Sequence, residues 1–288
     1  GCFHQHTFWL AVNNQFLLTS AGAITNWTSA STNFTDGRIA NYSNPNWSKL
    51  FPTYKNDFST PAGTLWFLQG FNGSNFATAG GVLDKLRARY GATRVVDVAA
   101  YSTCDGSGSA LPSVLGGAIY YYNGNCTVNA AQTFTNGTGS QDGSGLFLIN
   151  GNLTVNQNFQ YSDAPGPSRL KNIASAAWLV LGGVQVAPGV TQLDSSLIAL
   201  GNFAYGTGAV ACNAAASPLT CGTIYTGDDA ASPTALTARG VFVARQFALQ
   251  RTFADLFTPS ERFIYDGRLL ANTPLGLEHA IQSLPVWK

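Results

Sequence analysis

Residues 118–129 read AIYYYNGNCTVN and residues 145–156 read GLFLINGNLTVN, so both stretches contain Asn-Gly-Asn-x-Thr-Val-Asn. In each stretch an apolar run is followed by a glycine and then by a second, shorter apolar run. The same order recurs in WLVLGGVQV (178–186) and in LIALGNFAY (197–205), and VFVARQFAL (241–249) is a degenerate copy. The chain therefore contains an internal repeat.

The glycines of the repeat, Gly124, Gly151, Gly182 and Gly201, follow one another at intervals of 27, 31 and 19 residues. Intervals of about 20 to 30 residues are typical of solenoid coils, and a glycine between two short strands permits a sharp bend. In the last copy Arg245 takes the place of the glycine, 44 residues after Gly201, which leaves room for an additional coil around residues 222–225.

The repeat predicts a mainly β fold whose C-terminal region, residues 111–288, is a β-solenoid, or β-helix-like, region. The four glycines are then expected at equivalent bends. A β-sandwich of short strands is the alternative that fits much of the same pattern. We expect a helical cap near the C-terminus, because Thr258-Pro-Ser-Glu261 is a capping box in front of Phe263-Ile-Tyr265.

Residues 1–110 are predicted to form an irregular, β-rich N-terminal region with one helix. That helix begins at Val82 and ends at Tyr90, because the apolar residues recur at helical spacing and Gly91 can terminate it. Apolar segments at 8–12 and 16–18 flank Asn13-Asn14 and predict a hairpin. Strands are expected over 64–68 and 93–98, with a loop at 70–73.

Composition limits the partners. Asp, Glu, Lys and Arg make up 10% of the 288 residues, against roughly 25% in ordinary soluble domains, and 15 basic and 14 acidic side chains leave a net charge of +1. A surface with so little charge has no excess field to attract nucleic acid or anionic lipid. The longest uncharged apolar stretch, 174–190, is interrupted by glycine and proline, so we expect no membrane insertion.

The cysteines and the missing methionine favour an exported chain. With no methionine in the sequence, Gly1 is not a translational start, and we expect a mature protein that is extracellular or on the cell surface. Two local disulfides are predicted there, Cys104–Cys126 and Cys212–Cys221, each enclosing a segment of small residues. Cys2 is left for an intermolecular bond, and five reduced, buried cysteines are the alternative.

Eight asparagines stand in Asn-x-Ser/Thr sequons and are candidate glycosylation sites where the cell performs the modification. They are Asn26, Asn33, Asn41, Asn46, Asn72, Asn125, Asn136 and Asn152.

A resemblance covers about half of the chain. Residues 145–155, 184–203 and the terminal SERFIYDGR (260–268) with ANTP (271–274) resemble the C-terminal halves of large secreted bacterial surface proteins, some of them pilus-associated. The resemblance implies a β-solenoid displayed outside the cell with a role in assembly or adhesion. It carries no catalytic motif over to this chain.

No recognisable catalytic constellation accompanies the repeat. Asp228-Asp229 resembles one element of the polygalacturonase signature, but the further elements of that family are missing, so we interpret it as a solvated turn. The histidines are His4, His6 and His279; the first two could share a metal only with Cys2, which is too few ligands. We expect no cofactor, no metal and no enzymatic activity.

Three functions follow in order. The first is a non-enzymatic extracellular structural protein that self-associates as the subunit of a cell-surface filament or layer. The second is a glycan-binding adhesin, because aromatic side chains can stack on sugar rings; the candidates are Trp27, Tyr42, Trp47, Tyr54, Trp66 and the run 120–122, where alternation places at least one tyrosine outside the core. The third is a β-helix polysaccharide-degrading enzyme.

Overall fold

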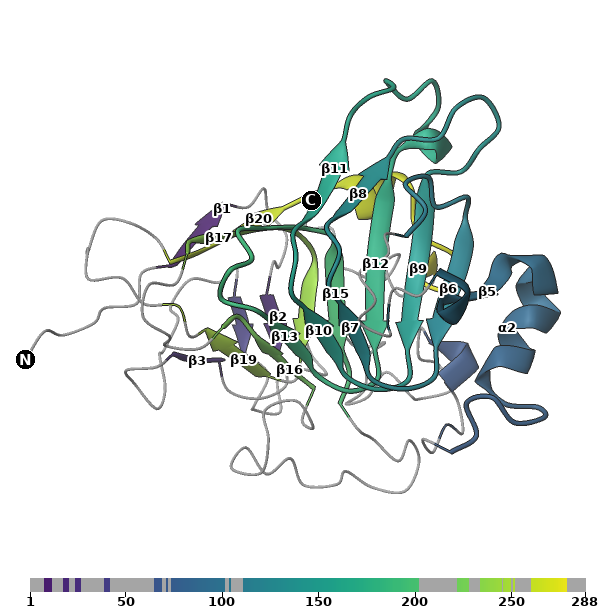
Figure 1. Cartoon of the computed structure of the whole chain (residues 1–288), viewed down its shortest axis with the longest axis horizontal. Coiled ribbons are helices and arrows are strands. Elements are labelled where there is room, and N and C mark those ends of the chain that lie inside the picture. The colour runs from purple at the N-terminus through teal and green to yellow at the C-terminus, as the bar shows by residue number, and fades with distance from the viewer. Residues whose placement is uncertain are drawn as a thin grey trace, which may run out of the picture.

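The computed structural model describes residues 8–11, 18–20, 24–26, 39–41, 65–68, 71, 74–101, 104, 111–201, 222–227, 234–244, 246–249, 251 and 260–278. For the four segments before residue 42 it describes the backbone alone. The chain forms three sheets of parallel strands that run side by side along one axis, with the helix α2 (Val82–Tyr90) at one end and the N-terminal strands at the other (Figure 1).

We number the sheets I to III. Sheet I has eight strands, in the order β4 (Ile39–Asn41), β2 (Leu18–Ser20), β18 (Phe242–Ala244), β15 (Ser196–Ala199), β12 (Ser175–Val180), β9 (Ser144–Ile149), β6 (Ala118–Tyr122) and β5 (Val95–Asp97). Sheet II has six: β3 (Ile24–Asn26), β19 (Gln246–Leu249), β16 (Thr223–Tyr225), β13 (Val184–Val186), β10 (Leu153–Val155) and β7 (Cys126–Val128). Sheet III has six: β1 (Phe8–Ala11), β20 (Glu261–Tyr265), β17 (Leu236–Gly240), β14 (Gln192–Asp194), β11 (Phe159–Ser162) and β8 (Gln132–Thr135).

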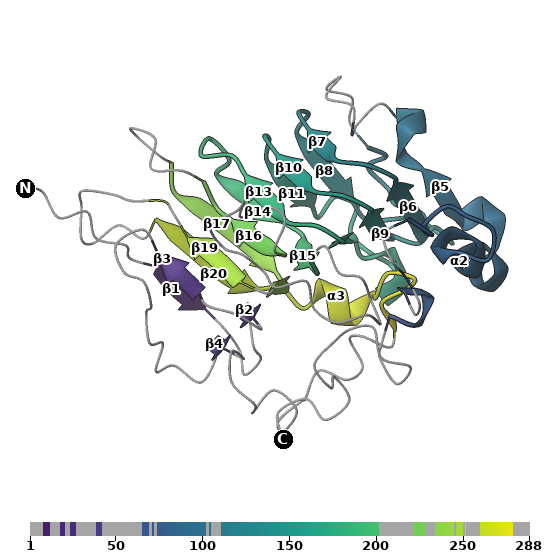
Figure 2. The same cartoon turned by 90° about the horizontal axis from the view of Figure 1, so that it is seen from below.

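Five coils build the solenoid, and each coil contributes one strand to each sheet. The chain runs through sheets I, II and III in turn, first as β6, β7 and β8, and returns to sheet I one strand further on as β9 (Figure 2). Every pairing between the described strands is parallel, for example Leu153 beside Cys126 and Val184 beside Leu153. The predicted β-solenoid is therefore confirmed, and the β-sandwich, which needs antiparallel pairs, is excluded.

The four repeat glycines stack at the bend between sheets I and II, as predicted. Gly182 N donates to Gly151 O at 2.8 Å, and Gly201 N donates to Gly182 O at 3.1 Å. A β-carbon on Gly151 would lie 2.3 Å from Gly124 O, so the coils approach each other there more closely than a side chain allows. Glycine is required at this bend because backbone packs on backbone.

The expected additional coil around residues 222–225 is wrong. Strand β16 (Thr223–Tyr225) belongs to the same coil as β15 and β17, and pairs with β13 on one side and β19 on the other. The longer interval between Gly201 and position 245 arises because residues 202–221, which lie outside the described residues, come between β15 and β16 in the sequence. Position 245 itself lies outside the described residues, between β18 and β19.

Two apolar clusters lie on the two faces of sheet I. The interior of the solenoid holds one face of each strand, including Phe147 and Trp178, whose rings stack at 4.2 Å between centroids. The other face carries Leu146, Leu148 and Leu179, which are covered by the described apolar residues between Leu65 and Leu86 and by Leu269 and Leu277. Burial on both faces explains why β9 and β12 are continuous runs without polar alternation.

Helix α2 has the predicted bounds and the predicted buried residues, Val82, Leu83 and Leu86, and Gly91 follows it with φ 90°. The strand expected over 64–68 is wrong, because residues Trp66–Leu68 form a 3₁₀ turn, η1, whose Phe67 and Leu68 pack under sheet I. The remaining 3₁₀ segments are η2 (Ala92–Arg94), η3 (Val98–Tyr101) and η4 (Leu170–Asn172). The expected strand at 93–98 shortens to β5.

The helical cap expected after Thr258 is also wrong. Residues Glu261–Tyr265 are strand β20, which pairs along its length with β17, and the short helix α3 begins only at Arg268 and ends at Ala271. The capping interaction does not form because the Glu261 carboxylate instead accepts from Thr226 Oγ1 and Arg251 N inside the solenoid. Tertiary pairing therefore overrides a local helix signal.

The predicted hairpin at 8–18 is wrong as well. Strand β1 pairs with β20 in sheet III, and β2 pairs with β18 in sheet I, each in parallel register. Strand β3 pairs with β19, and β4 pairs with β2. Strands from the first 41 residues thus continue all three sheets beyond the last coil, at the end opposite α2 (Figure 2).

Candidate functional site

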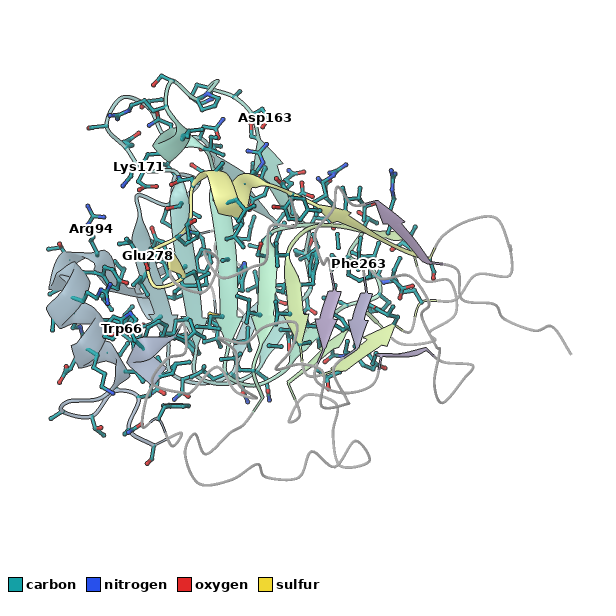
Figure 3. All side chains as sticks on the ribbon, turned by 180° about the vertical axis from the view of Figure 1, so that it is seen from behind. Trp66, Arg94, Asp163, Lys171, Phe263 and Glu278 are labelled. Carbon is teal, nitrogen blue, oxygen red and sulfur yellow. A yellow bond between two sulfur atoms is a disulfide. The ribbon has the colours of Figure 1, made fainter. Side chains whose placement is uncertain are left out.

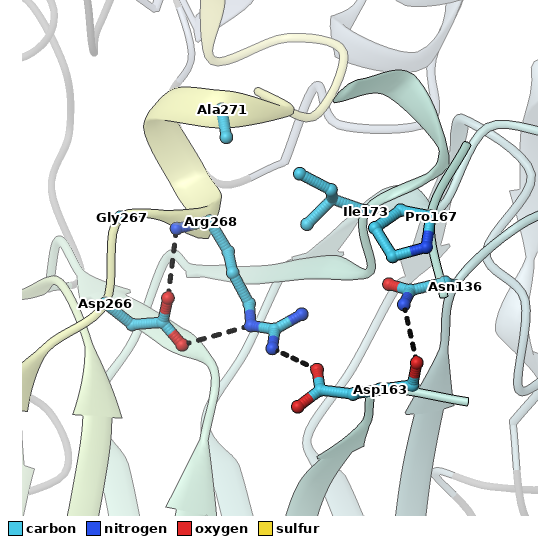
Figure 4. Close-up of a pocket in the computed structure, with 8 residues that line it drawn as sticks. All are labelled: Asn136, Asp163, Pro167, Ile173, Asp266, Gly267, Arg268 and Ala271. Atoms are coloured by element: carbon cyan, nitrogen blue, oxygen red, sulfur yellow. Dashed lines mark hydrogen bonds and ion pairs between the residues drawn. The ribbon is translucent and has the colours of Figure 1, made fainter. Parts of the chain in front are cut away.

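A pocket of about 390 Å³ opens beside sheet III, between the connection from β11 to β12 and the start of α3 (Figure 4). Three of its lining residues, Asp266, Gly267 and Arg268, come from the turn after β20, and Asp163, Pro167 and Ile173 come from the β11–β12 connection. Asn136 and Ala271 complete the lining. Residues about a hundred positions apart thus form one concave surface.

The Arg268 guanidinium is held between two carboxylates. Its Nη2 lies 2.5 Å from Asp163 Oδ1, and its Nε lies 3.3 Å from Asp266 Oδ2. The guanidinium carbon also lies 4.7 Å from the centre of the Tyr161 ring. The Asp163 side chain is 83% exposed, so its carboxylate remains accessible to a ligand in the pocket.

Asn136 is buried at the base of the β11–β12 connection and fixes its shape. Its Nδ2 donates to the carbonyls of Asp163 (3.3 Å) and Pro165 (2.9 Å), and its Oδ1 accepts from Ala174 N (2.8 Å). Both the amide nitrogen and the amide oxygen of Asn136 thus have partners, as expected for a buried polar side chain. The pocket therefore has a fixed floor, an accessible carboxylate and an apolar wall made by Pro167 and Ile173.

A second polar centre lies at the bend between sheets II and III. The buried Arg251 guanidinium donates to four backbone carbonyls, those of Ala187, Val190, Thr226 and Thr234, at 2.5–2.8 Å. Burial lowers the pKa of Arg251 to about 10. The negative charge of Glu261 acts in the opposite direction and raises this pKa, but its effect is smaller than that of burial. The side chain joins three successive coils, so its role is structural.

Glu261 lies next to this centre and is also buried. Burial raises the pKa of the Glu261 carboxyl, although hydrogen bonds from Ser260, Thr226 and Arg251 N and the positive charge of Arg251 act in the opposite direction. Its Oε2 accepts from Ser260 Oγ at 2.6 Å. A carboxyl so enclosed by its own fold has no path to a substrate.

Sequence reasoning found neither centre. Asp266, Gly267 and Arg268 are named in the sequence analysis only as part of the stretch 260–268 that carries the resemblance. Asp163 and Arg251 had no local signal, because their partners lie many residues away along the chain. Coil stacking brings these partners together, and a single sequence does not specify which loops meet.

The predicted cysteine pair at the first coil is present. Cys104 and Cys126 form a disulfide, and Cys104 O also accepts from Thr127 N at the outer edge of β7. Cys2, Cys212 and Cys221 lie outside the described residues, so the second predicted disulfide and the odd thiol stay predictions.

The sequon asparagines differ in their surroundings. Asn125 is exposed, Asn152 is half-buried, and both use Oδ1 to hold the next coil. Asn136 is 1% exposed. Asn26 and Asn41 lie on β3 and β4, whose side chains are outside the described part, as are Asn33, Asn46 and Asn72.

The described aromatic candidates are used in packing. Tyr120 faces the interior, where it stacks on Phe147 at 5.1 Å, and Tyr121 faces α2, where its hydroxyl accepts from Arg87 Nη2 at 3.2 Å. The two side chains therefore point to opposite faces of β6, as alternation along a strand predicts. The outer one, Tyr121, is covered by α2. Trp66 lies under the Arg89 guanidinium at 4.8 Å. Trp27, Tyr42, Trp47 and Tyr54 lie outside the described residues, as do His4, His6, His279, Asp228 and Asp229.

Comparison with known proteins assigns no family: neither a family model, nor a curated protein, nor a solved structure matches the chain. Within the described ranges, no three His, Cys, Asp or Glu side chains are grouped so that they could hold a metal ion. Among the helices that the structure describes, none is long and apolar enough to cross a membrane.

Proposed function

We propose that this chain is a non-enzymatic extracellular structural protein that self-associates as the subunit of a cell-surface filament or layer. The observation that carries the proposal is the parallel solenoid itself. Its three sheets run along one axis and end on the strands β1, β3 and β4. A strand at the end of a sheet is a template for pairing with another chain.

The two ends of the solenoid differ in chemistry. At the first coil, Cys104 O and Ser113 O accept from the backbone N–H groups of Thr127 and Thr135, so other parts of the chain lie along β7 and β8. At the opposite end, the terminal strands come from the first 41 residues. Contact between unlike ends is heterologous, and a heterologous contact that does not close into a ring gives an open filament.

Low surface charge supports association. Only 10% of the residues are charged, and the net charge is +1. Sheet II carries Thr127, Thr154 and Gln185 on its outer face, in register across three coils. Copies of such a chain meet without the electrostatic repulsion that keeps soluble monomers apart.

The resemblance to pilus-associated surface proteins and the Cys104–Cys126 disulfide support an extracellular location. The proposal is tested with purified protein. Light scattering and negative-stain microscopy under non-reducing conditions should record ordered polymer whose amount rises with concentration. A sample that stays monomeric up to high concentration would contradict the proposal.

A glycan-binding adhesin is the second candidate, favoured by the pocket at Asp163 and Arg268 (Figure 4). A carboxylate, a guanidinium and an apolar wall are groups that hold a hydroxylated ring. A glycan array tests it, with Asp163→Ala as the variant and Gln160→Ala, on the neighbouring exposed position of β11, as the matched control. A glycan bound equally well by both variants would remove this pocket from consideration.

A further inference from the structure

Beyond the last coil, the sheets of the solenoid are extended by strands from the opposite end of the chain. In sheet III, Leu10 lies beside Phe263; in sheet I, Thr19 lies beside Val243; and in sheet II, Thr25 lies beside Ala248. The coils were each added in sequence order, whereas these strands are added out of order. Figure 2 shows the N-terminal strands beside β19 and β20, far from α2.

The chain that links these strands to the rest is long. Residues 42–64, between β4 and Leu65, are 23 residues, which can span roughly 80 Å when extended. Sheet I from β4 to β5 has eight strands, which at the usual spacing cover roughly 34 Å. The extended link is therefore more than twice as long as sheet I is wide, so its length does not restrict the N-terminal strands to the last coil of their own molecule.

We propose that the strands β1 to β4 of one copy extend the sheets of a second copy beyond its last coil, through the same pairings that they make within one chain. This proposal rests on the self-association proposed above and names its mechanism. The exchanged strands make the same contacts in either arrangement, so exchange costs little free energy. Backbone hydrogen bonds supply the attraction, as in other cases of strand addition.

Exchange is also compatible with the first coil, where other parts of the chain already lie along β7 and β8. Because Cys104 and Ser113 lie along β7 and β8, direct stacking of one end on the other would have to displace them. Strand exchange leaves them in place: each copy accepts strands at its last coil and donates its own to the next copy. An open chain of copies results, with the first coil of each copy unchanged.

Paired cysteines test the exchange. Two variants, Thr19→Cys and Val243→Cys, each in a Cys2→Ser background, are produced together, concentrated and oxidised. Positions 19 and 243 face each other across β2 and β18, so exchange predicts a disulfide between two different chains and a band at twice the chain mass of 30.4 kDa. A second mixture contains Ala40→Cys and Val96→Cys, whose thiols lie on β4 and β5 at the two ends of sheet I. A cross-link in this mixture reports direct stacking of the β4 end of one copy on the β5 end of the next.

Each outcome has a distinct meaning. A 19–243 cross-link between chains in the polymer supports exchange. A polymer that cross-links through 40–96 and not through 19–243 overturns exchange and leaves the structural-subunit function standing. If the doubly substituted chain Thr19→Cys/Val243→Cys cross-links only within itself and no polymer forms, both proposals fail.

Discussion

Asn152 lies directly on Asn125, one coil further along the solenoid, and its backbone N–H donates to Asn125 Oδ1 at 3.0 Å. Asn152 repeats the arrangement, because its own Oδ1 accepts from Gly183 N in the next coil at 2.9 Å. Two further asparagine pairs of the repeat, Asn123–Asn150 and Asn129–Asn156, are joined side chain to side chain at 2.7 and 2.6 Å. The shared sequence motif is therefore a set of contacts between coils.

Removing one member of this ladder should destabilise the fold. Asn152→Ala leaves the buried Gly183 N–H without its acceptor, and an unsatisfied buried donor costs about 1–3 kcal/mol. We expect a decrease of that size in the free energy of unfolding, measured by urea denaturation. Gln157→Ala, at an exposed position of the same coil, between β10 and β11, is the control. Equal stability of the two variants would contradict a structural role for the ladder.

The glycine bend makes a separate prediction. A β-carbon on Gly151 would lie 2.3 Å from Gly124 O, whereas one on Gly166 would meet nothing within 4 Å. Gly151→Ala should therefore lower the free energy of unfolding by about 1–3 kcal/mol, as overpacking does. Gly166→Ala should change it by less than about 0.5 kcal/mol. Calorimetry of the two variants compares them, and an unchanged melting temperature for Gly151→Ala would refute the close stacking.

Glu261 predicts a pH dependence of stability. Its folded-state pKa is raised, mainly by burial, so the folded state binds its proton more tightly than the unfolded state does. This contribution to stability is complete below the unfolded pKa of about 4.3 and is lost as the pH rises through the folded pKa. Glu261→Gln cannot ionise and should remove that decline.

The measurement is the urea midpoint of the protein and of Glu261→Gln from pH 4 to pH 8. The urea midpoint of Glu261→Gln should rise relative to that of the unsubstituted protein as the pH rises. Gln160→Glu, which places a carboxyl on an exposed position of β11, is a control that should follow the unsubstituted protein. A pH-independent difference between the protein and Glu261→Gln would show that the carboxyl is not perturbed by burial.

Asn136 should carry no glycan even where the cell modifies other sequons. Its amide is buried and donates to the Asp163 and Pro165 carbonyls, so a sugar on Nδ2 would replace one of these N–H donors and would force open the β11–β12 connection. The exposed Asn125 is the internal comparison. Glycopeptide mapping of native protein decides this point, and a glycan on Asn136 in folded material would contradict the described packing.

Local signals identified those parts of the fold that depend on neighbouring residues. The Asn-Gly-Asn repeat predicted the coils, and the apolar spacing from Val82 to Tyr90 predicted α2. Distant pairing decided the rest. Glu261–Tyr265 has a helix-capping signal but becomes a strand because β17 pairs with it, and Phe8–Ala11 pairs with β20 and not with its neighbour in sequence.

The same reasoning explains the candidate site. Arg268 meets Asp163 across about a hundred residues, because α3 returns over the solenoid after the last coil. Asn272 makes this return tight, since its Nδ2 lies within 3.0 Å of Asp142 Oδ1, Lys171 O and Ile173 O. Beyond it, Glu278 Oε2 accepts from the hydroxyl of Tyr90, the last residue of α2, and Figure 3 labels Glu278 and Trp66 at this end of the molecule. The C-terminal segment thus ties the last coil to the first, and no sequence pattern marks such a contact.

We propose that the chain works as a repeating subunit outside the cell. The most direct measurement is electron microscopy of native cell-surface material labelled with antibody against this chain. We expect regularly spaced label along an ordered filament or across an ordered layer. Label confined to single, scattered molecules, with no ordered polymer on the cells, would contradict it.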